Sequence, residues 1–121
     1  MKQKATLVIG ASTNPGRYSH IAVHRLRSYK HPVIAFGPKP GKVADTDIET
    51  EWNPEWQVDT VTLYMNPQRL ENYTQQILDL RPRRVIFNPG TESPEFIREL
   101  RAQGIEAEVA CTLVMLSVGQ Y

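Results

Sequence analysis

Short apolar runs recur along the chain, separated by segments in which apolar residues return every three or four positions. A short apolar, β-branched run predicts a buried strand, because a sheet covered on both faces lacks the polar alternation of a half-exposed one. The last run, "IEAEVA", contains glutamates, which favours a position at the edge of the sheet. The runs span residues 5–9, 33–36, 60–64, 84–87 and 105–110.

The segments between these runs predict amphipathic helices. Asn66-Pro67 and Ser93-Pro94 each begin one, because the polar side chain can cap free N–H groups and proline fits the first turn. Thr112 is expected to cap a last short helix through Val118. The apolar faces comprise Tyr18, Ile21, Ala22, Leu26 and Tyr29, then Leu70, Tyr73, Ile77 and Leu80, and finally Phe96, Ile97 and Leu100.

Strands that alternate with helices predict a parallel sheet, since each right-handed crossover places a helix on one of its faces. We therefore expect an α/β fold: a Rossmann-like, doubly wound, mainly parallel five-stranded sheet with helices on both faces, formed as a single domain over residues 1–121. Residues 43–58 are expected to add only a short extended piece near 43–48.

Ligands bind such sheets at the carboxyl ends of the strands. Four of those ends are rich in glycine, proline, asparagine and small hydroxyl residues. They are "GASTNPGRYS" at 10–19, "GPKPGK" at 37–42, "YMNP" at 64–67 and "NPGTE" at 88–92.

The loop after the first strand has the chemistry of a phosphate site. Gly10 lacks a side chain, so a pyrophosphate can approach its backbone, and Ser12, Thr13, Asn14 and Ser19 offer neutral donors. Arg17 adds a positive charge, and the N-terminus of a helix lies behind the loop. The glycine spacing matches neither the dinucleotide fingerprint nor the P-loop, so the prediction depends on these residue types alone.

The end of the second strand bears on which nucleotide is bound. Domains that bind NAD usually place an acid there to hold the ribose hydroxyls. This chain has "AFGPKPGK" instead, in which Lys39 and Lys42 supply positive charge and no acid is present. Lysines in that place favour a ribose that carries an extra phosphate, as in NADP or coenzyme A, although they also suit an exposed turn.

Composition narrows the class of protein. The formal net charge is +1, which argues against a general nucleic-acid binder, and no apolar run is long enough to cross a membrane. The apolar stretch at the start of the chain is too short for a signal peptide. A single cysteine fits a reducing cytoplasm, where we expect the protein to act.

No catalytic residue or metal site can be assembled from the sequence. Cys111 has no base near it in the chain and is expected to be a buried, structural residue. His20 and His24 lack further ligands and are expected on a helix surface. Glu92 lies near the ligand edge, where its charge also favours the N-terminus of the next helix.

Four stretches together resemble a known family: "VIGASTNPGRYSHIAVHRL", "VIAFGPKPGKV", "DTVTLYMNPQRLENYTQQIL" and "GIEAEVACTLVM". The chain resembles the small stand-alone CoA-binding domain proteins, and is similar to the N-terminal CoA-binding domain of the succinyl-CoA synthetase alpha subunit. The first stretch is the most specific, because its Gly, Ser, Asn-Pro and Arg residues stand where that family has its phosphate loop. The resemblance implies a Rossmann-like fold that binds coenzyme A or an acyl-CoA, without ligase chemistry.

The resemblance also implies where the ligand is bound. The first loop lines the pyrophosphate, the second loop meets the adenosine end, and residues after the third and fourth strands flank the rest of the ligand. The implied cofactor-binding residues are Gly10, Ala11, Ser12, Asn14, Arg17 and Ser19, then Gly37, Pro38 and Lys39, then Met65 and Asn66, and lastly Asn88, Pro89 and Gly90.

Two other functions stay open at the level of the sequence. A small NADP-dependent oxidoreductase would need a second lobe for the nicotinamide, which the partner in a homodimer could supply. A nucleotide-binding interaction module with a vestigial pocket would need no bound cofactor. The leading expectation is a CoA-binding module without evident catalytic residues.

Overall fold

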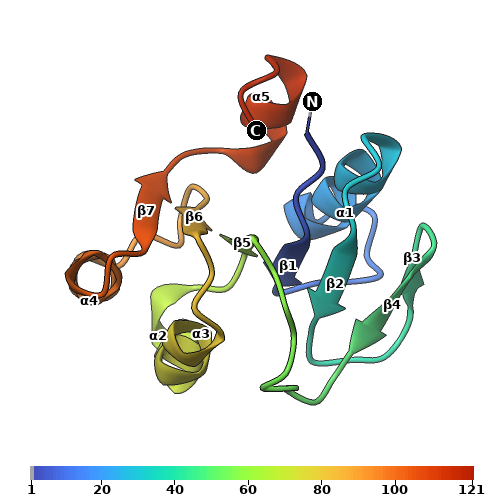
Figure 1. Ribbon diagram of the computed structural model, residues 1–121. Coiled ribbons are helices and arrows are strands. Elements are labelled where there is room, and N and C mark those ends of the chain that lie inside the picture. Colours follow the sequence, from blue (N-terminus) through green and yellow to red (C-terminus); the bar gives the residue numbers. More distant parts are fainter. Residues whose placement is uncertain (1) are drawn as a thin grey trace.

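The five apolar runs form five neighbouring strands of the sheet in the computed structural model, which describes residues 2–121 (Figure 1), and the last run lies at an edge, as expected. β1 (Thr6–Ile9) pairs with β2 (Val33–Phe36) on one side and with β5 (Thr60–Leu63) on the other. β6 (Arg84–Phe87) and β7 (Glu106–Val109) follow beyond β5. All of these pairings are parallel, so the carboxyl ends of the strands share one edge of the sheet.

Two further strands extend the sheet, so the expected count of five strands is wrong. β3 (Lys42–Val43) and β4 (Thr46–Glu49) form an antiparallel hairpin around a turn at Ala44, whose φ is +55°. β4 pairs in parallel with β2, and the described part of the chain forms one seven-stranded sheet in the order β3-β4-β2-β1-β5-β6-β7. Both strands overlap the short extended piece expected near 43–48, but the sequence did not predict their pairing, because they are half-exposed, with polar residues between the buried ones.

Helices cover both faces of the sheet, as expected (Figure 1). Leu7 and Ile9 of β1 pack in the core under α2, α3 and α4, while Val8 packs in the core under α1 and α5, because neighbouring strand residues point to opposite faces. Among the described residues, no helix has the length and apolarity needed to cross a bilayer. The helices are α1 (Tyr18–Ser28), α2 (Pro67–Leu70), α3 (Thr74–Leu80), α4 (Pro94–Ala102) and α5 (Thr112–Ser117).

The two proline-containing helix starts are confirmed. The Asn66 side-chain oxygen accepts a hydrogen bond from the N–H of Arg69 at 2.9 Å, and the Ser93 hydroxyl accepts one from the N–H of Phe96 at 3.3 Å. In both helices proline occupies the first turn, where its missing N–H costs nothing. These caps fix where the chain turns back after β5 and β6.

Two other expectations about the helices are wrong. Thr112 is not a cap but the first residue of α5, and its hydroxyl lies 2.8 Å from that of Thr62. Residues 67–80 do not form one helix, since a 3-10 turn at Glu71–Tyr73 separates α2 from α3. A 3-10 turn also places residues three apart on one face, so the spacing of Leu70 and Tyr73 imitates an uninterrupted α-helix.

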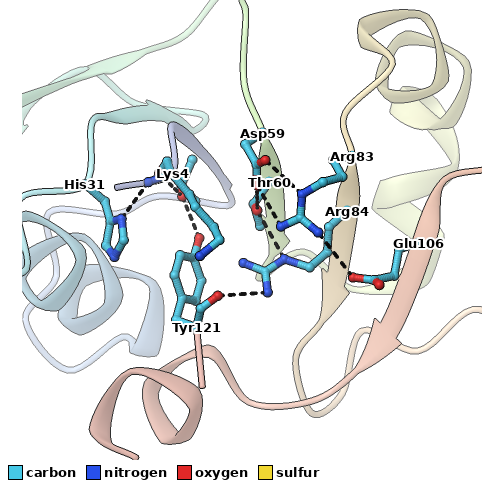
Figure 2. A network of polar contacts seen from close by, with 9 residues as sticks. Lys4, His31, Asp59, Thr60, Arg83, Arg84, Glu106 and Tyr121 are labelled. Carbon is cyan, nitrogen blue, oxygen red and sulfur yellow. Dashed lines mark hydrogen bonds and ion pairs between the residues drawn. The ribbon is translucent and has the colours of Figure 1, made fainter. Parts of the chain in front are cut away.

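A polar network joins the strands at their amino-terminal ends (Figure 2). Buried Arg84 donates to the Thr60 hydroxyl at 3.1 Å and to the Tyr121 carbonyl oxygen at 3.2 Å, and its guanidinium lies 4.6 Å from the centre of the Tyr121 ring. The Tyr121 hydroxyl in turn pairs with the hydroxyl of Thr6 at 2.5 Å. Side chains therefore hold this end of the sheet together, and the loops predicted to bind a ligand lie at the opposite edge.

Candidate functional site

A pocket of about 670 Å³ lies at the carboxyl edge of the sheet, where the loops after β1, β2, β5 and β6 meet. This is the edge at which parallel sheets bind ligands, and the volume is typical of a small-molecule site. The pocket is lined by Gly10, Ala11, Ser12, Thr13, Gly16, Arg17, Tyr18, Ser19, Pro38, Lys39, Tyr64, Met65, Asn66, Arg69, Pro89, Gly90 and Thr91.

Most of the cofactor-binding residues expected from the sequence line this pocket, although they come from four separate loops. Those that line it are Gly10, Ala11, Ser12, Arg17, Ser19, Pro38, Lys39, Met65, Asn66, Pro89 and Gly90. Three others, Asn14, Gly37 and Asn88, are not among the lining residues, and their contacts are structural.

Asn14 and Gly37 shape the loops beside the pocket. The side-chain oxygen of Asn14 accepts a hydrogen bond from the N–H of Gly16 at 2.9 Å, which closes a turn within the first loop. A Cβ on Gly37 would collide with the carbonyl oxygen of Ala11. Glycine at this position therefore allows the loop after β2 to touch the loop after β1.

Asn88 ties together β5, β6 and the start of α5. Its side-chain nitrogen donates to the Thr62 hydroxyl at 2.7 Å and to the Leu63 carbonyl oxygen at 2.8 Å. Its side-chain oxygen accepts from the N–H of Thr112 at 2.9 Å. Because Asn88 is only 2% exposed and its side-chain amide makes these bonds, its role is structural.

Gly10 allows two backbone segments to approach each other closely. Its φ is +96°, and a Cβ there would lie 2.9 Å from the backbone carbon and oxygen of Tyr64. The N–H groups of Gly10 and Ala11 both donate to the Phe36 carbonyl oxygen at 2.9 Å. These two amides are therefore already used, and a bound phosphate must find its backbone donors further along the loop.

Two amides in the loop remain free. The N–H of Asn14 donates to the Ser12 hydroxyl at 3.0 Å, that of Gly16 donates to the Asn14 side chain, and that of Arg17 donates to the Asn14 carbonyl oxygen at 3.0 Å. Within the described chain, the N–H groups of Ser12 and Thr13 have no acceptor, and both residues line the pocket. Unpaired donors beside a cavity suit an anionic ligand.

The N-terminus of α1 is also open to the pocket. Arg17 occupies the N-cap position, but its side chain makes no capping hydrogen bond. The N–H groups of Tyr18 and Ser19, which follow it and line the pocket, have no acceptor among residues 2–121. An uncapped helix start carries free donors and a partial positive charge, both of which attract phosphate oxygens.

The charges around the pocket are of one sign. Arg17, Lys39 and Arg69 line it, and no aspartate or glutamate of the described residues does. Glu92, the acid expected nearest to the ligand edge, accepts a hydrogen bond from the N–H of Gly90 at 2.8 Å and so belongs to the turn after β6. The pocket therefore favours anions.

Sequence reasoning missed several of the lining residues. Arg69 belongs to the short helix α2, which begins at Asn66-Pro67 directly after β5, and a cation so close to the carboxyl end of a strand was a signal that could have identified it. Tyr18 was assigned to the apolar face of α1, yet it is 71% exposed beside the pocket. The missed residues are Gly16, Tyr18, Tyr64, Arg69 and Thr91, whereas Thr13, expected as a donor of the first loop, lines the pocket.

Cys111 is not among the residues that line the pocket. It occupies the N-cap position of α5 and is partly exposed, so the expectation of a buried residue is wrong.

Burial raises the pKa of the nearby Tyr64 phenol far above its ordinary value, and the charge of Cys111 adds to the rise, so this phenol stays neutral at physiological pH. Among the described residues, no three His, Cys, Asp or Glu side chains lie close enough to hold a metal ion.

Comparison with known proteins identifies the family. The model of the CoA binding domain matches residues 4–117. The chain belongs to the CoA binding domain family. Every residue that lines the pocket lies within the matched stretch, and family membership supports CoA binding in general, which agrees with the preference of the pocket for anions.

Solved structures similar to this CoA binding domain share its fold over nearly their whole length. A protein described as uncharacterized is 45% identical, with a TM-score of 0.96 and 100% of both chains covered. A conserved hypothetical protein from Pyrococcus furiosus is 26% identical, with a TM-score of 0.78 over 93% of this chain and 98% of the other. The cell-free protein ID.343 from Thermus thermophilus is 23% identical, with a TM-score of 0.87 over 98% and 91%. No curated protein matches the chain.

Proposed function

We propose that the protein binds coenzyme A or an acyl-CoA in the pocket at the carboxyl edge of the sheet. One observation carries the proposal. The uncapped start of α1 opens on a pocket that is lined by Arg17, Lys39 and Arg69 and has no acid among its described lining residues. Coenzyme A carries a pyrophosphate and a 3′-phosphate, so it presents the spaced negative charges that such a pocket attracts.

The ligand's phosphates account for the separate donors and cations. In the proposed arrangement the pyrophosphate meets the free amides of Ser12 and Thr13 and the start of α1, with Arg17 beside it. The adenosine lies over the loop after β2, where Lys39 meets the 3′-phosphate. The pantetheine arm then runs toward the loops after β5 and β6, which carry no further cation beyond Arg69 among the described lining residues.

We propose binding without chemistry at this site. No His, Cys, Asp or Glu lines the pocket within the described chain, so the hydroxyls of Ser12, Thr13 and Ser19 have no histidine or carboxylate base beside them to activate them as nucleophiles. The residues present can hold phosphates and exclude water from the pantetheine arm. An acyl group on the thiol would therefore be carried unchanged.

Calorimetric titration with CoA, acetyl-CoA and pantetheine tests this function. We expect CoA and acetyl-CoA to bind with similar affinity, because the phosphates supply the recognition, and pantetheine to show no measurable binding. Arg17→Ala should weaken CoA binding by about fivefold to tenfold, the value of one hydrogen bond to a charged group at an exposed site. Arg25→Ala, a change at an exposed arginine of the same helix, should leave the affinity unchanged. Pantetheine binding as tight as that of CoA, or no binding of CoA at all, would contradict the proposal.

A further inference from the structure

We propose that His20 is a positioning residue for the phosphate site, because it orients the peptide between Ser12 and Thr13 so that the Thr13 N–H faces the bound anion. The inference rests on the proposed function, since the anion is a phosphate of CoA. His20 is not among the residues that line the pocket, so it acts through the loop and not by contact with the ligand.

The hydrogen bond between His20 and the loop has only one possible direction. Nδ1 of His20 lies 3.1 Å from the carbonyl oxygen of Ser12. A carbonyl oxygen can only accept, so Nδ1 carries the proton and donates it. His20 belongs to the first turns of α1 and Ser12 to the loop that precedes it, so this bond ties the loop to the helix whose N-terminus opens on the pocket.

The geometry of the peptide bond means that the hydrogen bond from His20 also orients the N–H of Thr13. The described chain contains no cis peptide bond, and in a planar trans peptide the C=O and the N–H point in opposite directions. Because His20 holds the Ser12 carbonyl, the N–H of Thr13 points away from His20. That N–H has no acceptor in the described chain, and Thr13 lines the pocket.

Of the described contacts in the loop, only the His20 bond holds an atom of this peptide directly. The Asn14 N–H donates to the Ser12 hydroxyl at 3.0 Å, which spans the peptide but bonds neither its C=O nor its N–H. Gly10 and Ala11 are anchored on the Phe36 carbonyl oxygen, and the residues after Thr13 are held by the Asn14 turn. Without the His20 bond, the Ser12–Thr13 peptide can rotate and turn its carbonyl oxygen toward the pocket. A carbonyl oxygen repels a phosphate where an amide N–H attracts it, so the orientation of this one peptide changes the affinity.

Three variants separate this role from general effects on the helix. His20→Ala removes the donor. His20→Asn restores a donor, because the Asn side-chain nitrogen is the same number of bonds from the backbone as Nδ1 of histidine. His24→Ala is the matched control: the His24 ring is 4.9 Å from that of His20, centre to centre, but within residues 2–121 it has no hydrogen bond to the loop.

The experiment titrates each ¹⁵N-labelled protein with inorganic pyrophosphate and, separately, with CoA, and follows the amide signals of Ser12 and Thr13 by NMR. His20→Ala should weaken the binding of both ligands by about threefold to tenfold, the value of one hydrogen bond, and should reduce the shift of the Thr13 signal. His20→Asn and His24→Ala should stay within about twofold of wild type. Thermal unfolding of each variant shows whether the helix itself has been damaged.

Each outcome decides the inference separately from the proposed function. Wild-type affinity in folded His20→Ala would overturn it, as would a His20→Asn variant as weak as His20→Ala. If CoA binds without moving the Thr13 signal, the positioning role is overturned and the proposed function stands. If pyrophosphate moves the Thr13 signal in the expected order of variants but CoA does not bind, the proposed function fails and the positioning role stands. If neither ligand binds, both are overturned.

Discussion

At the scale of single residues, Gly10 and Gly90 share a left-handed backbone but differ in their surroundings. Their φ values are +96° and +91°, yet a Cβ on Gly10 would lie 2.9 Å from the Tyr64 backbone, whereas a Cβ on Gly90 would have nothing within 4 Å. Gly10→Ala should therefore lower the free energy of unfolding by about 3 kcal/mol, and Gly90→Ala by about 1 kcal/mol, since both carry backbone strain and only the first must displace the backbone that follows β5. Urea denaturation measures both losses. Equal losses would show that the approach of Tyr64 is not tight.

The residue types of the candidate site could be predicted more readily than their roles. Gly10 and Lys39 line the pocket because the carboxyl ends of parallel strands share one edge of the sheet, and the alternation of strands and helices in the sequence already predicts such a sheet. Asn88 follows a strand in the same way, but a side-chain amide can satisfy buried backbone and hydroxyl groups as readily as a ligand, and here it does so. Only the three-dimensional contacts distinguish these two uses.

At the scale of elements, the starts of α1 and α4 differ in capping and so in what they can bind. Arg17 leaves the start of α1 uncapped, whereas Ser93 caps α4. Arg17→Ser should stabilise the protein by about 1 kcal/mol, because serine can bond the free N–H groups, and should weaken CoA binding by removing both those donors and a cation. Ser93→Ala should cost about 1 kcal/mol of stability without changing the affinity.

Chemical denaturation and calorimetric titration of the two variants test this trade between stability and binding. A stabilised Arg17→Ser that keeps the affinity of wild type would mean that the start of α1 does not contact the ligand. Loss of affinity in Ser93→Ala would mean that capping affects the pocket indirectly, through the packing of the helices.

The strands differ in how clearly the sequence predicts them. Residues 60–63 are all buried, so an unbroken apolar and β-branched run predicts both the place and the type of β5. Residues 46–49 alternate between buried and exposed, and such a short polar alternation is also typical of a loop. The hairpin of β3 and β4 exists because β2 has a free edge for it to pair with, which is a tertiary cause that the local pattern does not contain.

At the scale of the whole molecule, His31 makes stability depend on pH. It is fully buried, and its Nδ1 accepts a hydrogen bond from the N–H of Lys4 at 2.9 Å (Figure 2). Burial lowers the pKa of His31 below its ordinary value of 6.5, and the positive charges of Lys4 and Arg84 add to the effect. Near this pH, His31 therefore binds a proton more readily in the unfolded chain than in the folded one. As a result, the free energy of unfolding falls as the pH drops below about 6.5.

His31→Asn should remove this dependence, because asparagine can accept the same N–H but does not titrate. Between about pH 7.5 and 5.5, wild type should lose about 1 kcal/mol more stability than the variant, within the limit of about 1.4 kcal/mol per pH unit for one proton. Urea denaturation at both pH values gives the two slopes. Parallel slopes would assign the pH dependence to another group.

Since the polar network and the pocket lie at opposite ends of the same strands, recognition of the ligand can be tested without disturbing what holds the sheet together. The most direct measurement is calorimetric titration with CoA and with dephospho-CoA, which lacks only the 3′-phosphate. Wild type should bind CoA about fivefold more tightly, the value of about 1 kcal/mol for an exposed charged contact. Lys39→Ala should abolish most of this preference, and Lys42→Ala, an exposed lysine outside the pocket, should keep it. Equal affinity of wild type for the two ligands, or no binding of CoA, would contradict the account.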